Sequence, residues 1–313
     1  MLDSASKIFF HLIAQSRILK HLASRYGMRK PSSFARRFIA GETAAEAIEA
    51  ARALETRGLT TTLDLLGESV TNLAEADAAT RAYIDVIDAI VASGIAERNV
   101  SLKLTQLGLD VDKASAVDNL RKILERAQPA GFFVRIDMEN SPYTEVTLEI
   151  VETLWQHGYH QIGVVLQAAL YRSEKDLERM NALGVRVRLV KGAYKEPKSV
   201  AYPKKADVDA AYARMVKALL ARGHYPAIAT HDPVILGLAR QYASDNGIAP
   251  DRFEFQMLYG VRRDLQTKLA AGGYKLRVYI PFGREWFPYF MRRLGERPAN
   301  VMFVIRSVFG ETG

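Results

Sequence analysis

Eight short β-type segments alternate with longer helical patterns from about residue 59 onward, and this alternation limits the fold more than any other feature of the chain. The β-type segments are residues 59–65, 99–105, 132–138, 161–167, 185–190, 227–231, 252–258 and 275–281. The helical patterns are residues 70–93, 114–128, 143–157, 173–183, 208–222, 233–246, 261–271 and 286–297. Strands that alternate regularly with helices predict a parallel sheet with right-handed crossovers.

Eight strand–helix units in a chain of 313 residues predict an α/β fold, a distorted (β/α)8 TIM-type barrel. An open, doubly wound sheet is the alternative, but no G-x-G-x-x-G turn follows the first strand. Residues 1–45 are expected to form an N-terminal helical arm, and residues 46–313 the barrel domain. Six glycines precede strands, where helix C-caps are expected: Gly94, Gly131, Gly158, Gly184, Gly223 and Gly273.

Several strands carry one polar face. Because strand side chains alternate between the barrel interior and the helix layer, an apolar outer face leaves the polar side chains inside. The inward set is Lys103, Asp137, Arg188, Gln256 and Tyr279. Buried charges need partners or a polar ligand, and these residues fall near strand C-terminal ends, where barrel enzymes collect catalytic groups. We therefore predict a polar site at the barrel mouth, with an ion-pair network at the barrel floor as the alternative.

The segment from residue 289 to residue 296 places a phenol, two guanidinium groups and a carboxylate on one helix face. At helical spacing Tyr289, Arg292, Arg293 and Glu296 lie three to four residues apart. Each Arg can present two parallel N–H donors to a carboxylate, so the segment could bind a small acid. A solvated helix face is the alternative interpretation.

Composition narrows the function classes. The chain has no Cys, which excludes disulfides, thiolate chemistry and iron–sulfur clusters. It has no H-E-x-x-H or similar spacing, so a metal hydrolase is not expected. The net charge of +8 comes without a dense basic tract, which argues against nucleic acid. No apolar run approaches the ~18 residues of a membrane span, and we expect a cytoplasmic protein, with a peripheral position at the inner membrane face left open.

Nine segments, roughly one per strand–helix unit, resemble the proline dehydrogenase family. They are residues 63–68 (LDLLGE), 101–105 (SLKLT), 135–139 (RIDME), 164–168 (VVLQA), 186–194 (RVRLVKGAY), 229–231 (ATH), 253–260 (FEFQMLYG), 278–283 (VYIPFG) and 289–296 (YFMRRLGE). Each is a weak motif alone, but their order along nearly the whole barrel is specific. The resemblance implies a monofunctional, FAD-dependent enzyme of bacterial type.

The resemblance also implies a role for each matched residue in substrate binding. Arg292, Arg293 and Lys103 would bind the carboxylate of L-proline, and Asp137 would fix the substrate side of the pocket. The residues that would enclose the pyrrolidine ring are Tyr279, Tyr289, Leu258 and Tyr194. Glu68 would pair with the arginines when the pocket is empty.

A second group of matched residues would hold the flavin. Arg188 would lie beside the flavin N5 and stabilise the reduced ring. The residues implied to bind the rest of FAD are Met138, Gln167, Lys191, Gly192, Ala193, Thr230, His231 and Gln256. A histidine such as His231 is, taken alone, more often a hydrogen-bonded scaffold residue.

The implied reaction is hydride transfer from C5 of L-proline to FAD, giving 1-pyrroline-5-carboxylate, with a quinone as electron acceptor and transient contact with a membrane surface. The chain ends at Gly313, so we expect the product to pass to a separate pyrroline-5-carboxylate dehydrogenase. Tyr279 favours proline over 4-hydroxyproline in this family, although another cyclic amino acid stays possible. The remaining rivals are a Schiff-base aldolase-type barrel using Lys103 or Lys191, and a non-catalytic carboxylate-binding module.

Overall fold

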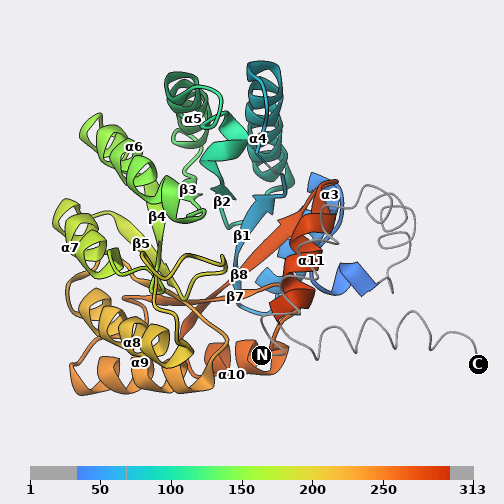
Figure 1. The fold of residues 1–313 in the computed structure, drawn as a ribbon. Helices are drawn as coiled ribbons and strands as arrows, with labels where there is room; N and C mark the ends of the chain where they lie inside the picture. Colours follow the sequence, from blue (N-terminus) through green and yellow to red (C-terminus); the bar gives the residue numbers. More distant parts are fainter. Residues whose placement is uncertain (1–33, 68, 297–313) are drawn as a thin grey trace, which may run out of the picture.

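A computed structural model of the chain describes residues 34–67 and 69–296 (Figure 1). The predicted (β/α)8 barrel is confirmed, because eight parallel strands pair in sequence order and β1 closes the sheet by pairing with β8. The strands are β1 (Thr60–Leu65), β2 (Asn99–Leu102), β3 (Phe133–Ile136), β4 (Ile162–Gln167), β5 (Arg186–Val190), β6 (Ala227–Ala229), β7 (Glu254–Leu258) and β8 (Lys275–Phe282).

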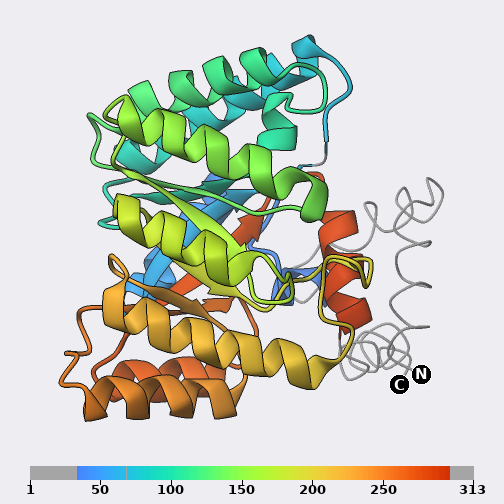
Figure 2. The same cartoon turned by 60° about the vertical axis from the view of Figure 1, so that its left-hand side comes forward.

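Helices surround the barrel and connect successive strands (Figures 1 and 2). A short helix, η1 (Phe34–Arg37), and α3 (Ala44–Glu55) precede the first strand. The others are α4 (Leu73–Ser93), α5 (Lys113–Ala127), α6 (Thr144–Gln156), α7 (Ser173–Leu183), α8 (Lys205–Arg222), α9 (Pro233–Asp245), α10 (Arg263–Ala271) and α11 (Trp286–Glu296), with short turns η2 (Leu104–Leu107) and η3 (Ser141–Tyr143). Within the described ranges no helix is long and apolar enough to cross a bilayer.

The predicted segments and the observed elements agree in order and differ at their ends. β2 stops at Leu102 because the chain turns into η2 from Lys103, and α4 begins at Leu73 because the Asn72 side chain caps it. Five of the six predicted C-capping glycines have positive φ. Gly223 was predicted wrongly: its backbone is extended, with φ −80° and ψ 156°. Residues 1–33 of the predicted arm lie outside the described residues.

The barrel interior holds two polar layers. At the floor, Arg277 is 9% exposed and donates from Nε to both Glu254 oxygens at 3.0 and 3.1 Å, and from Nη1 to Glu97 at 2.7 Å. Burial alone would raise the pKa of Glu254, but the Arg277 guanidinium lowers it overall. The floor network considered as an alternative therefore exists, and it lies below the polar residues of the mouth.

A second, smaller core joins η1 to α11. Its buried members include Phe38, Ile39, Trp286 and Phe290. The Trp286 indole N–H donates to Glu42 at 3.0 Å, and the backbone N–H of Ala40 donates to the carbonyl of Pro281 at the same distance. These contacts hold α11 at the end of the barrel, beside the loop that follows β5 (Figure 2).

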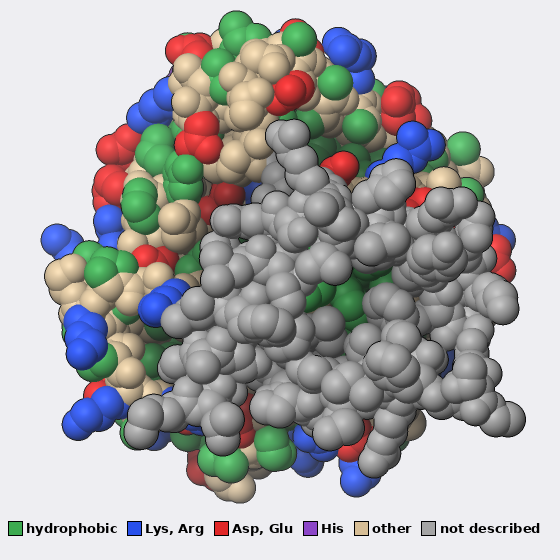
Figure 3. Space-filling view, turned by 45° about the vertical axis from the view of Figure 1, so that its right-hand side comes forward, with side chains coloured by type: hydrophobic (Ala, Val, Ile, Leu, Met, Phe, Trp, Pro, Cys, Tyr) green, Lys and Arg blue, Asp and Glu red, His purple; other side chains and the backbone are tan. Residues whose placement is uncertain are grey.

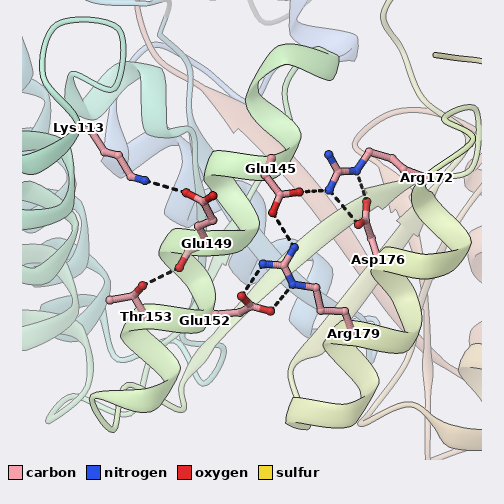
Figure 4. A network of polar contacts seen from close by, with 8 residues as sticks. All are labelled: Lys113, Glu145, Glu149, Glu152, Thr153, Arg172, Asp176 and Arg179. Atoms are coloured by element: carbon pink, nitrogen blue, oxygen red, sulfur yellow. Dashed lines mark hydrogen bonds and ion pairs between the residues drawn. The ribbon is translucent and has the colours of Figure 1, made fainter. Parts of the chain in front are cut away.

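Ion pairs link the outer helices. On the face seen in Figure 3, basic and acidic side chains are intermixed around the rim. Arg179 of α7 is bound by two carboxylates of α6, at 2.9 Å from Glu145 and through both oxygens of Glu152 (Figure 4). Arg172 pairs with Glu145 from the other side and with Asp176 at 2.7 Å. Hydrogen bonds from these arginines lower the pKa of Glu145.

We expect Arg179→Met to lower the free energy of unfolding by about 0.5–1 kcal/mol near neutral pH, because the network is partly exposed. A carboxyl group whose pKa is lowered by folding stabilises the protein above its ordinary pKa of about 4.3, and this contribution is lost as the pH falls through the folded pKa. The difference between variant and wild type should therefore narrow in urea unfolding below about pH 4. Lys113→Met, which breaks the exposed Lys113–Glu149 pair, is the control and should cost less.

Gly260 lets η1 approach the barrel. Its φ is +72°, and a Cβ there would lie 1.6 Å from the carbonyl oxygen of Arg37. Gly58 has the same φ of +72° with no atom within 4 Å of such a Cβ. We expect Gly58→Ala to cost about 1–2 kcal/mol from the backbone alone, and Gly260→Ala to cost at least about twice that by displacing η1. Equal losses for both variants in chemical unfolding would contradict this account.

Candidate active site

One cavity of about 570 Å³ opens where the barrel strands end. Its volume falls within the ~300–1,000 Å³ typical of cofactor and substrate sites. Every residue predicted to bind substrate or cofactor lines this cavity, apart from Arg292. The side chains of Arg292 and Glu296, and residue Glu68, lie outside the described part of the structure. The residues meet because the carboxyl ends of all eight parallel strands share one rim.

The centre of the cavity wall is a three-residue contact between β3, β5 and β8. Arg188 donates from Nη1 to Asp137 Oδ1 at 2.6 Å, and the Tyr279 hydroxyl donates to Asp137 Oδ2 at 2.7 Å. The Arg188 guanidinium carbon lies 5.2 Å from the centre of the Tyr279 ring. Burial, and then the carboxylates of Asp137 and Asp64, raise the pKa of Tyr279 well above its usual value. Tyr279 therefore stays a protonated donor.

Lys103 and Asp64 form a buried ion pair beside this contact. Their Nζ and Oδ1 atoms are 3.5 Å apart, and the Asp64 side chain is 1% exposed. Burial alone would lower the pKa of Lys103, but Asp64 and Asp137 raise it, so Lys103 stays an ammonium. Burial raises the pKa of Asp64. Sequence reasoning did not assign Asp64 to the site, although it alternates with Thr60 and Thr62 on the inward face of β1.

Helix α11 supplies the side of the cavity opposite the strand ends. Tyr289 is buried, and the Arg293 guanidinium carbon lies 5.4 Å from the centre of its ring. Both line the same cavity as Lys103, so two cations from different elements face one space. Such a pair can attract and orient a small carboxylate.

The turn after β5 forms another part of the wall. Gly192 has φ +112°, and a Cβ there would lie 3.2 Å from both the Ala169 Cβ and the Gln167 Oε1. The Lys191 ammonium is held by Asp209 at 2.5 Å and Asp232 at 2.8 Å. Lys191 thus reaches the cavity, as predicted, but its charge is already balanced by two carboxylates.

Residues of β6 and β7 show a scaffold role in addition to lining the cavity. The backbone N–H of Leu258 donates to His231 Nε2 at 3.0 Å, so this nitrogen is unprotonated. The Thr230 hydroxyl accepts from the backbone N–H of Asp232 at 3.1 Å. Gln256 donates to Glu254 and so connects the mouth to the floor network. For His231, the hydrogen-bonded scaffold interpretation and a place in the cavity both hold.

The loop that carries Tyr194 is fastened across the mouth. Glu196 accepts from the backbone N–H of Ser141 at 2.8 Å and from its hydroxyl at 2.5 Å. Tyr194 is 37% exposed at the edge of the cavity. Within residues 34–67 and 69–296, no group of three or more His, Asp or Glu side chains is placed to hold a metal ion.

Comparison with known proteins adds independent findings. The family model described as proline dehydrogenase matches residues 47–306. The chain is 42% identical to proline dehydrogenase 2 of Bacillus subtilis (strain 168) over 300 residues, covering 96% of this chain and 97% of that protein. It is 44% identical to proline dehydrogenase of Deinococcus radiodurans over 284 residues, covering 90% and 91%.

A solved structure matches the fold. It is proline utilization A (PutA) from Bdellovibrio bacteriovorus inactivated by N-propargylglycine, with a TM-score of 0.79 and 29% identity over 90% of this chain. The match covers 34% of that protein, so this chain corresponds to about a third of it. The barrel therefore has a solved counterpart within a larger protein.

We expect Asp64→Asn to lower the free energy of unfolding by about 3 kcal/mol, because it leaves the Lys103 ammonium buried beside a neutral group. The double variant Asp64→Asn/Lys103→Met removes both charges and should recover more than half of that loss. Urea unfolding of the single and double variants gives the coupling between the two residues. Strictly additive losses would show that the pair is not coupled.

Proposed function

This chain belongs to the proline dehydrogenase family, and we propose that it oxidises L-proline to 1-pyrroline-5-carboxylate with FAD as its cofactor and a quinone as electron acceptor. The observation that carries the proposal is the cavity in which Arg188, Asp137 and Tyr279 lie beside the cations Lys103 and Arg293. One end of such a site suits a carboxylate, and the other suits an electron-rich ring.

Substrate binding follows from charge and shape. Lys103 and α11, with Arg293 and Arg292, would bind the carboxylate of L-proline. The ring of the substrate would be enclosed by Tyr279, Tyr289, Leu258 and Tyr194. Fixing the carboxylate at one end limits the positions of the substrate C5 atom, which is how binding energy contributes to orientation. Asp137 would keep Tyr279 and Arg188 in place on that side of the pocket.

The residues present fit a flavin. The Nε of Arg188 is buried and has no hydrogen-bond partner among the described residues, so a polar group could still be bound there. The φ of Gly192 and the short distance to Gln167 leave room for a close approach to the backbone. Holding the cofactor would fall to Met138, Gln167, Lys191, Gly192, Ala193, Thr230, His231, Gln256 and Arg188. Bound FAD supplies the hydride acceptor.

The protein's own contribution is orientation and electrostatics. Oxidation removes a hydride from the C5 atom of proline and a proton from its nitrogen, and the proton passes to solvent. Arg188 would hold a fixed positive charge close to where negative charge develops, at no cost of reorganisation during the reaction. Asp137 binds Arg188 strongly enough to prevent that charge from turning into the substrate space.

Wider expectations rest on the family. Electrons would leave through a quinone, with transient contact at the inner face of the membrane, and a separate pyrroline-5-carboxylate dehydrogenase would consume the product. The protein would work in the cytoplasm. Residues 1–45 would form an N-terminal arm and residues 46–313 the catalytic domain.

The Schiff-base alternative is disfavoured by charge. Both candidate lysines, Lys103 and Lys191, are paired with carboxylates, which raise their pKa values against the opposing effect of burial. A Schiff-base lysine needs a lowered pKa to act as a neutral amine. Oxidation of 4-hydroxyproline instead of proline, or binding without oxidation, would each give a distinct result in the following experiment.

The test is an anaerobic absorption spectrum of the purified protein before and after addition of L-proline. We expect a flavin band that bleaches with L-proline, because the substrate reduces the cofactor, and that is unchanged by D-proline and 4-hydroxyproline. A flavin band unaffected by L-proline would keep the cofactor and refute the substrate. Protein that stays colourless after incubation with FAD would refute the flavoenzyme proposal.

Two variants serve as matched controls for the carboxylate site. Arg293→Met should retain the flavin band but need about tenfold more L-proline for bleaching, because one charged hydrogen-bonding partner is lost. Arg262→Met removes a cation that also lines the cavity but is paired with Asp264 at 2.8 Å. It should bleach as the wild type does.

A further inference from the structure

Ser101 lies beneath the cavity and contacts Arg188. It is on the inward face of β2, two residues before Lys103, and its side chain is fully buried. Its hydroxyl oxygen accepts from Arg188 Nη2 at 3.1 Å. Ser101 does not line the cavity, so it would act on a bound molecule only through Arg188.

The orientation of the Arg188 guanidinium depends on two anchors. Nη1 binds Asp137 of the chain segment after β3, and Nη2 binds Ser101 of β2. A planar guanidinium held at one nitrogen can still rotate about that contact, whereas contacts at two nitrogens fix its plane. Only the Nε of this side chain is buried without a hydrogen-bond partner among the described residues.

A neighbouring positive charge makes the second anchor more important. Arg135 is 3% exposed, and after burial itself, Arg188 is the largest cause of the lowered pKa of Arg135. The two guanidinium groups therefore repel each other inside the barrel. In the parallel register Ser101 lies between Asp64 and Arg135. Its hydroxyl oxygen gives Arg188 a neutral acceptor on the side of Arg135.

We propose that Ser101 is a positioning residue that fixes the Arg188 guanidinium and thereby stabilises the reduced flavin. The inference rests on the proposed function, because it needs a bound flavin to be expressed. Without the hydroxyl, Nη2 loses its buried acceptor and the guanidinium is held by Asp137 alone. The stabilisation of the reduced cofactor then falls, while the carboxylate-binding groups Lys103 and Arg293 are unaffected.

The experiment compares Ser101→Ala, Ser101→Thr and the control Thr61→Val. Thr61 is fully buried at the neighbouring position range of β1, but it faces the helices and its hydroxyl has no partner. For each protein we would measure the reduction potential of the bound flavin, kcat and KM for L-proline, and the thermal midpoint. The potential is a readout that a merely structural role would not change.

We expect Ser101→Ala to lower kcat about tenfold and to make the flavin potential more negative by about 30 mV, which is a tenfold change for a two-electron couple. KM should stay within about twofold. Ser101→Thr retains the hydroxyl and should lie close to the wild type in potential, as should Thr61→Val. If Ser101→Ala does not fold, Ser101→Cys replaces it, since sulfur is a weak acceptor of similar size.

A wild-type potential and kcat in Ser101→Ala, or in Ser101→Cys where it stands in, would overturn the inference. An equal shift in Thr61→Val would also overturn it, because the effect would then be general to the barrel. Failure of the proposed function looks different: the wild type itself would bind no flavin, or its flavin would not be reduced by L-proline.

Discussion

The structure depends on the carboxylate of Asp137, which binds Arg188 and Tyr279 at the same time. Three side chains from separate strand regions meet there in a nearly dry environment. Each would be costly to bury alone, because an unpaired charge or hydroxyl loses its hydration. Together they are compatible with burial and fix the relative positions of β3, β5 and β8 at the barrel mouth. The cavity exists because this contact occupies the wall and not the centre.

The floor and the mouth use the same residue types for different ends. At the floor Arg277 is bonded to Glu254, Glu97 and a backbone carbonyl, and this fills the base of the barrel. At the mouth, Arg188 keeps a buried Nε without a partner among the described residues. The floor therefore contributes to the fold, whereas the mouth retains donors for a ligand. One alternating pattern along the strands encodes both layers.

Sequence reasoning could predict what periodicity determines, and it failed where pairing across the barrel decides. The inward positions of Lys103, Asp137 and Arg188 follow from alternation along single strands. The importance of Asp64 does not, because its partner is Lys103 on another strand and one Asp among threonines resembles a strand end. The cap at Gly223 was predicted from residue type, but the helix there leaves in an extended conformation. The carboxylates around Lys191 come from two other helices' starts, which local sequence cannot bring together.

Helix α11 is held by a core separate from that of the barrel, and this division has a functional consequence. Tyr289 and Arg293 are positioned by the packing of Trp286 and Phe290 on Phe38, and by the close approach of η1 to Gly260. The Arg188–Asp137–Tyr279 contact is positioned by the strands. A change in the small core can therefore alter how the carboxylate of a substrate is bound while the groups proposed to face the flavin keep their places. Binding and electron transfer are thus supported by two structural units that meet only at the cavity.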